Sequence, residues 1–201
     1  MFCKIDLTGA SEYSSDSLLS NDLYTRVSKK TSILAFHDDE FSWIRCEGKG
    51  SFQNSPCIKE RANNEIESGS IKIVIDLEDC TGMDSTFMGT MAGIAMRLLK
   101  IPGASLQVAA PGKRNRQSLE DLGLDAIMDL DPEDGSWDAR LIVARKHMQP
   151  YAEGMTNLKN APHVLDAHKK LCEADANNAE KFNTVLDFLE ADVKSSTVSS
   201  N

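Results

Sequence analysis

The stretch that decides the fold is IKIVIDLEDCTGMDSTFMG, residues 71–89. Its first seven residues form an apolar run rich in β-branched side chains, which is typical of a central strand covered on both faces. A turn follows at residues 78–83. The apolar positions between Phe87 and Leu99 then recur with the 3.6-residue period of a helix, which we expect to span residues 84–100. A buried strand therefore leads through a tight turn into an amphipathic helix.

The segments before this stretch predict a hairpin and a helix. Two β-enriched runs flank the polar residues 37–40, as in an antiparallel hairpin. Ser55-Pro56 then predicts a helix start, with the Ser55 hydroxyl as N-cap and the proline at the first helical position. The helix is expected to end near residues 68–69.

The segments after the stretch continue the alternation of strands and helices. We expect a strand ending at residues 111–112, a short helix over 113–122, an edge strand over 126–130, and a helix marked by Trp137, Leu141 and Met148. The order β-β-α-β-α-β-α-β-α predicts an α/β domain over residues 32–148. Such an order gives a single mixed, mostly parallel sheet with helices packed on it.

The remaining segments differ from this domain in composition. Residues 1–31 are polar and predict a flexible arm, and residues 149–161 contain Pro, Gly and Asn and predict a linker. Residues 162–193 predict one long C-terminal helix, followed by a disordered tail at 194–201. The apolar stripe of the long helix allows two interpretations: the helix folds back on its own domain, or it serves as a dimerisation or docking arm.

Composition and charge exclude several classes of protein. Hydrophobic residues make up 41% and charged residues 26%, as in a folded soluble protein, and the net charge of −9 argues against a general nucleic-acid binder. The five cysteines are odd in number and lack C-x-x-C spacing, which fits neither a disulfide framework nor a zinc site. Without an apolar signal-peptide core or a membrane span, we expect a cytoplasmic protein. No catalytic, metal-binding or cofactor motif is present.

The residues with the clearest chemistry lie where the predicted helix begins. Asp84 can cap the helix by accepting a hydrogen bond from the amide of Thr86 or Phe87. The Ser85 hydroxyl then lies at a helix N-terminus, where a phosphate would gain from free amides and the helix dipole. Such a phosphate would add about two negative charges beside Asp84 and so switch the surface electrostatically. The alternative is that these residues only cap the helix, because such caps are common.

This strand, turn and helix resemble the signature of the STAS family, the domain shared by sulfate transporters and bacterial anti-sigma factor antagonists. In that family a hydrophobic strand leads through Asp and a turn to Met/Val-Asp-Ser, and Met83, Asp84 and Ser85 occupy these places. The resemblance covers about residues 32–131. One departure is Phe87, which stands where the family usually has glycine.

The resemblance implies a phosphorylation switch. Ser85 would be the phosphoacceptor, and Met83, Asp84 and Thr86 would form the partner-docking turn. The implied partners are a serine kinase that is also an anti-sigma factor, sequestered while Ser85 is unphosphorylated, and a serine phosphatase that resets the switch. The protein itself would be a regulator and not an enzyme.

Two further features of the sequence are candidates for contacts. Lys113 and Arg114 belong to a basic cluster that could contact an anion or an acidic partner surface. Gly89 and Gly93 lie one turn apart inside the predicted helix, where glycine costs about 1 kcal/mol relative to alanine, so we expect a close approach of helix and sheet.

Two other functions remain open at this point. A STAS-like module could bind a nucleotide or another small anionic ligand at the same helix N-terminus. Alternatively, the chain could be a constitutive scaffold that works through its C-terminal helix. That helix could also form a homodimer.

Overall fold

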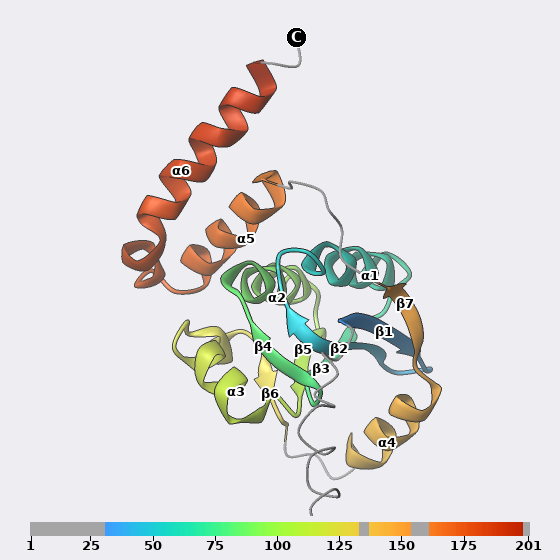
Figure 1. Cartoon of the computed structure of the whole chain (residues 1–201). Helices are drawn as coiled ribbons and strands as arrows, with labels where there is room; N and C mark the ends of the chain where they lie inside the picture. Colours follow the sequence, from blue (N-terminus) through green and yellow to red (C-terminus); the bar gives the residue numbers. More distant parts are fainter. Residues whose placement is uncertain (1–30, 133–136, 154–160, 199–201) are drawn as a thin grey trace, which may run out of the picture.

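The computed structural model describes residues 31–132, 137–153 and 161–198. The predicted N-terminal arm therefore lies outside the described residues, apart from its last position. Figure 1 shows a sheet with helices on both faces and a pair of C-terminal helices beside it.

The strands form one mixed sheet in the order β6-β5-β3-β2-β1-β7, and β4 pairs with β2 beside this path. Pairs β2–β3, β3–β5, β5–β6 and β2–β4 are parallel, whereas β1 pairs antiparallel with β2 and β7. The predicted α/β fold with one mixed, mostly parallel sheet is confirmed. The strands are β1 (Ser32–His37), β2 (Ser42–Gly50), β3 (Lys72–Asp76), β4 (Cys80–Met83), β5 (Ser105–Ala109), β6 (Asp129–Leu130) and β7 (Gln149–Glu153).

The helices divide between the two faces of the sheet and the C-terminal pair. Helices α1 and α2 cover one face, α4 covers the other, and α5 packs on α2 (Figure 1). The helices are α1 (Ser55–Glu67), α2 (Ser85–Leu98), α3 (Gly112–Glu120), the short 3₁₀ helix η1 (Leu124–Ala126), α4 (Trp137–His147), α5 (Ala161–Ala174) and α6 (Asn178–Val198).

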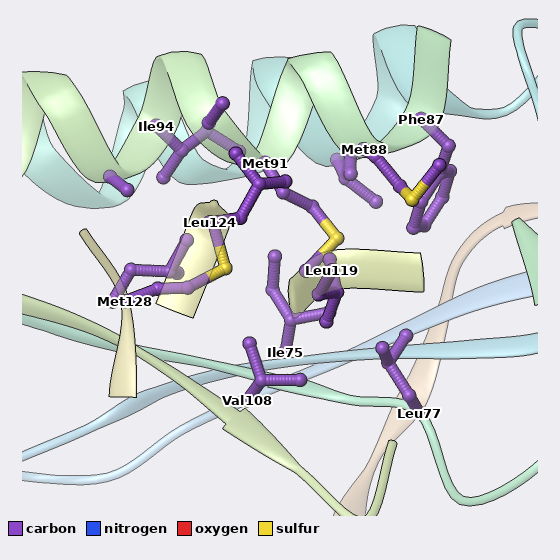
Figure 2. Close-up of a cluster of buried hydrophobic side chains, with 14 of the residues drawn as sticks. Ile75, Leu77, Phe87, Met88, Met91, Ile94, Val108, Leu119, Leu124 and Met128 are labelled. Carbon is purple, nitrogen blue, oxygen red and sulfur yellow. The ribbon is translucent and has the colours of Figure 1, made fainter. Parts of the chain in front are cut away.

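The alternation of side chains along β3 divides the core in two. Ile73 and Ile75 belong to the large cluster beneath α2, whereas Val74 belongs to a smaller cluster on the α4 side. All three are fully buried, as expected for a central strand. Figure 2 shows Ile75, Leu77 and Val108 from the sheet facing the apolar side chains of α2, which include Phe87, Met88, Met91 and Ile94.

The C-terminal region differs from the single long helix that the sequence predicts. It forms two helices, and α6 extends to Val198, into the predicted tail. The Nδ2 atom of Asn178 donates to the carbonyl oxygens of Leu122 and Leu171, both at 2.9 Å. The Asp175 carboxylate accepts from the Asn177 amide at 2.8 Å. These polar side chains satisfy backbone groups at the turn and so end α5.

The predicted linker at residues 149–161 is also wrong in its first part. Residues Gln149–Glu153 form β7, which pairs antiparallel with β1 at the end of the sheet. Pro150 suggested a break, but an edge strand tolerates proline because one side of its backbone has no partner strand. Residues 154–160 lie outside the described residues.

Smaller differences concern short elements. The predicted turn at residues 78–83 contains β4, and the predicted edge strand at 126–130 is only the two-residue β6, preceded by η1. The hairpin of β1 and β2 is confirmed, as are the helices α1, α2, α3 and α4, whose ends shift by a few residues.

Candidate functional site

The predicted phosphoacceptor lies at the junction of β4 and α2. Ser85 is the first residue of α2, and β4 is held beside β2 through the pairing of Met83 with Gly50. The Asp84 amide donates to the Gly50 carbonyl at 3.0 Å, which fixes the chain immediately before the helix. The hydroxyl therefore lies at the N-terminus of α2, directly after a strand that is held in the sheet.

Asp84 fixes this turn with both carboxylate oxygens. Oδ1 accepts from the Phe87 amide at 2.9 Å, so the predicted N-cap is confirmed. Oδ2 accepts from the Phe52 amide at 2.9 Å and ties the loop before α1 to the start of α2. Both bonds are charge-assisted, and they hold a negative charge beside Ser85.

The Ser85 hydroxyl has a partner that the sequence does not reveal. Its Oγ lies 2.9 Å from Nε2 of His168 on α5, and Nδ1 of His168 lies 2.8 Å from the carbonyl oxygen of Val164. A carbonyl can only accept, so Nδ1 carries the hydrogen, and in the neutral imidazole Nε2 accepts a hydrogen bond that the Ser85 hydroxyl donates. His168 is 4% exposed, and its ring meets the Phe182 ring edge-on. The only signal in the sequence is that His168 interrupts an apolar stripe.

A second histidine of α5 makes a similar contact. Nε2 of His163 lies 2.8 Å from the Ser55 hydroxyl and 3.3 Å from the Thr90 hydroxyl. Ser55 is therefore not the N-cap of α1 that the sequence predicts; that position is held by Asn54, and Ser55 lies inside the helix. Burial lowers the pKa of His163, as does the charge of Lys59, whereas Asp166 and Asp84 partly oppose the shift.

The lowered pKa of His163 predicts acid destabilisation. Above pH 6.5, the pKa of the unfolded state, the imidazole is neutral in both the folded and the unfolded chain. As the pH falls from 6.5 through the lower pKa of the folded state, the unfolded chain binds the proton first. The free energy of unfolding therefore decreases over this range. Each unit of difference corresponds to about 1.4 kcal/mol. We expect urea unfolding at pH 7.5 and pH 5 to show a smaller loss for His163→Gln than for the wild type. An equal loss in both would contradict the prediction.

The other residues predicted for partner docking differ in exposure. Met83 is half-buried and packs against the core, and Thr86 is only 4% exposed. Asp84 and Ser85 are half-buried. Phe87, the departure from the family pattern, is fully buried, so it changes the core and not the surface of the turn.

The predicted basic contacts lie on a neighbouring helix. Lys113 and Arg114 are exposed in the first turn of α3. In the next position, Asn115 donates from Nδ2 to the Cys80 carbonyl at 2.8 Å. This bond ties α3 to the strand that leads to Ser85, and it leaves the two cations at the surface.

The glycines of α2 face α5, not the sheet. A Cβ atom added to Gly89 would lie 2.2 Å from the Ala167 carbonyl oxygen, whereas one added to Gly93 would lie 3.4 Å from Cγ of Lys170. The predicted close approach of helix and sheet is therefore wrong: the close approach is between two helices. It depends on Gly89, because no other residue leaves room for the backbone of α5 there.

On the opposite face of the sheet, an ionic cluster joins β3 to α4. Asp76 is fully buried and accepts from Nε and Nη2 of Arg145 at 2.8 and 2.9 Å. Arg45 contacts Asp76, Glu78 and Asp79. Burial lowers the pKa of Arg45, but the charge of Asp76 and the hydrogen bonds to the other carboxylates raise it above its ordinary value. The sequence does not reveal this cluster, because its members are far apart in the chain.

Two kinds of feature are absent from the part of the chain that the structure describes: a membrane-spanning helix and a cluster of metal ligands. Across 31–132, 137–153 and 161–198, none of the helices is both long and apolar enough to span a membrane. Within the same ranges, His, Cys, Asp and Glu side chains do not gather in groups of three or more that could hold a metal ion.

Comparison with known families settles the identity of the core domain. The model of the STAS domain matches residues 32–135, which include the whole of β1 to β6 and the Ser85 turn. The chain belongs to the STAS family. None of the curated proteins compared with it matches.

Solved structures match part of this chain at low identity. An anti-sigma factor antagonist from Mycobacterium paratuberculosis is 21% identical, with a TM-score of 0.45 over 57% of this chain and 94% of that one. The Bacillus cell fate determinant SpoIIAA in its phosphorylated form is 23% identical, with a TM-score of 0.43 over 53% of this chain and 96% of that one.

Proposed function

We propose that this STAS protein is a non-enzymatic, phosphorylation-controlled regulator that acts in the cytoplasm as an anti-sigma factor antagonist does. With Ser85 unphosphorylated, it binds and sequesters a serine kinase that is also an anti-sigma factor. Phosphorylation of Ser85 by that kinase releases the partner, and a serine phosphatase resets the switch.

One observation carries this proposal: a serine hydroxyl stands at the start of α2, directly after Asp84 and at the end of β4. The helix N-terminus favours the added phosphate, because free amides and the dipole stabilise negative charge there. The fixed Asp84 carboxylate, 2.9 Å from the amides of Phe52 and Phe87, makes the same surface strongly anionic after phosphorylation. The family resemblance supports the choice of Ser85 over its neighbours.

The surface around Ser85 supports a protein partner. Met83 and Asp84 precede the hydroxyl and share its half-buried position, and the exposed Lys113 and Arg114 on α3 offer positive charge to an acidic partner surface. Thr86 contributes less, because its side chain is buried. We assign docking to the turn from Met83 to Ser85, with the two cations at the rim.

Phosphorylation should occur at one residue. The chain is incubated with ATP and the serine kinase, of the histidine-kinase-like ATPase class, whose gene lies nearest to its own, and the products are mapped by peptide mass spectrometry. We expect one phosphate on Ser85, none on the Ser85→Ala variant, and normal modification of the control Thr86→Ala. Phosphate on Thr86 alone, or on residues 1–31 alone, contradicts the assignment.

A second role is proposed for the C-terminal helices. Phe188 of α6 is 71% exposed and Val185 is 39% exposed, and the two lie three residues apart on the helix. Neighbouring apolar side chains on one helix face support association with a second copy of this chain. Such a homodimer would leave the Ser85 switch in place.

A further inference from the structure

We infer that the C-terminal hairpin of α5 and α6, residues 161–198, is a self-docked competitor of the kinase: it covers the Ser85 hydroxyl, and the kinase must displace it before phosphorylation. The inference rests on the proposed function, because it concerns access to the same atom. Figure 1 shows α5 lying along α2, with α6 beyond it.

The hydroxyl itself is occupied. The Ser85 Oγ lies 2.9 Å from Nε2 of His168, whose ring is 4% exposed and is held from behind by the Phe182 ring at a centroid distance of 5.2 Å. Phosphoryl transfer requires the incoming phosphorus in line with Oγ and a base positioned to accept the hydroxyl proton. In this structure Nε2 accepts the hydrogen bond from Oγ, and the His168 ring fills the space on that side of the hydroxyl. A kinase therefore cannot engage Oγ until α5 withdraws.

The contact extends along α2 and reaches α1. The Ala167 carbonyl packs so closely on Gly89 that a Cβ atom there would lie 2.2 Å from its oxygen. His163 spans the hydroxyls of Ser55 on α1 and Thr90 on α2. At the rim, Nζ of Lys59 donates to Asp166 at 2.6 Å. The helix α5 thus occupies the groove between α1 and α2 that begins at Ser85.

The surface of α2 next to Ser85 differs from the rest of the surface that α5 covers. Around Ser85, α2 presents Ser85, Gly89, Thr90 and Gly93 to α5, and these residues are small or polar. The apolar part of the contact lies farther along α5, where Leu171 belongs to the main hydrophobic core. A surface pocket of about 350 Å³ lies between the helices, with Lys59, Asn63, Ile94, Arg97, Asp166 and Lys170 among its lining residues.

Apolar contacts farther along the hairpin keep it docked. Leu171 is 0% exposed and belongs to the main hydrophobic core, Ala174 and Phe182 pack against that core, and Asn178 donates to the Leu122 carbonyl at 2.9 Å. The closed state therefore predominates, and the apparent affinity for the kinase is reduced in proportion to the fraction of open molecules. Any change that opens the hairpin raises the rate of phosphorylation by the same factor.

The two glycines of α2 provide a matched test. Gly89→Ala and Gly93→Ala each add one methyl group to the same helix and favour its formation equally. The new Cβ at position 89 collides with the backbone of α5, whereas the one at position 93 meets only the flexible Lys170 side chain at 3.4 Å. We expect amide hydrogen exchange over residues 161–174 of the full chain to be about tenfold faster or more in Gly89→Ala than in Gly93→Ala or the wild type.

The rate of phosphorylation at Ser85 tests whether the hairpin competes with the kinase. With the serine kinase described above and ATP, the initial rate at Ser85 should rise about tenfold or more in Gly89→Ala and stay unchanged in Gly93→Ala. Equal exchange in the two variants, or faster exchange without faster phosphorylation, overturns the inference. Absence of phosphate on Ser85 in every variant overturns the proposed function, and the competition with it, whatever the exchange shows.

A second pair of variants guards against misfolding. Should Gly89→Ala lose its cooperative thermal transition, His168→Ala takes its place, because it removes the bond to Ser85 without adding an atom. His147→Ala on α4 is its control, since His147 is exposed on the other face of the sheet, where Nδ1 bonds the Val143 carbonyl and the ring lies 5.7 Å from that of Phe36, far from Ser85. Faster exchange over 161–174 and faster phosphorylation in His168→Ala alone support the inference; rates equal to those of His147→Ala overturn it.

Discussion

Replacing Asp76 with alanine is expected to lower the free energy of unfolding by about 3–5 kcal/mol. The carboxylate is fully buried and accepts two hydrogen bonds from Arg145, at 2.8 and 2.9 Å, while Arg45 contacts it from β2. Its removal leaves two guanidinium groups beside a space from which water is largely excluded. The loss should also loosen α4, because Arg145 belongs to that helix.

Glu78 provides the control for this prediction. It bonds the same two arginines, at 2.7 Å to Arg145 and 3.0 Å to Arg45, but its side chain is 47% exposed. Water can therefore replace most of the hydrogen bonds that the carboxylate makes to the two arginines. Glu78→Ala should lower the free energy of unfolding by about 1 kcal/mol or less. Urea denaturation of both variants measures the difference. Equal losses would show that burial does not decide the strength of the cluster.

The central part of the fold was predictable because local pattern and tertiary position agree there. The run at residues 71–77 contains β3, in which residues 73–76 are buried, and the helical period after Phe87 becomes the buried side of α2. The Asp84 cap depends on atoms three residues apart, so spacing alone revealed it. These features depend on residues that are close together in the chain, and so they can be predicted from the sequence pattern.

The features that were missed depend on contacts between distant segments. Nothing near Pro150 indicates that β1 lies alongside it, and nothing near Gly89 indicates that its neighbour is Ala167. The role of His168 follows from a bond across 83 positions, and a histidine that interrupts an apolar stripe is equally consistent with a solvated position. At the end of α5, Asn178 bonds the Leu171 carbonyl of that helix and also the Leu122 carbonyl, which belongs to the core domain. Contacts of this kind can be identified only from the tertiary structure.

Changing Ser85 to aspartate is expected to weaken kinase binding at least about tenfold, which corresponds to roughly 1.4 kcal/mol. At an interface the carboxylate must shed its water, and an unpaired buried charge can cost several kcal/mol. Within the folded chain the same charge is tolerated. It lies in the first turn of α2, where the helix dipole favours it by about 0.3–1 kcal/mol, offset in part by repulsion from Asp84.

The matched variant is Ser85→Ala, which removes the hydroxyl without adding charge. It should bind the kinase at least as tightly as the wild type, because it also loses the bond to His168 that holds α5 over the site. Titration calorimetry with the kinase and thermal melts of both variants give the two measurements. Unchanged affinity in Ser85→Asp would favour a constitutive scaffold over a switch. A melt that collapses in both variants would mean that the bond from Ser85 to His168 holds the fold together, because its loss is the one change that the two variants share.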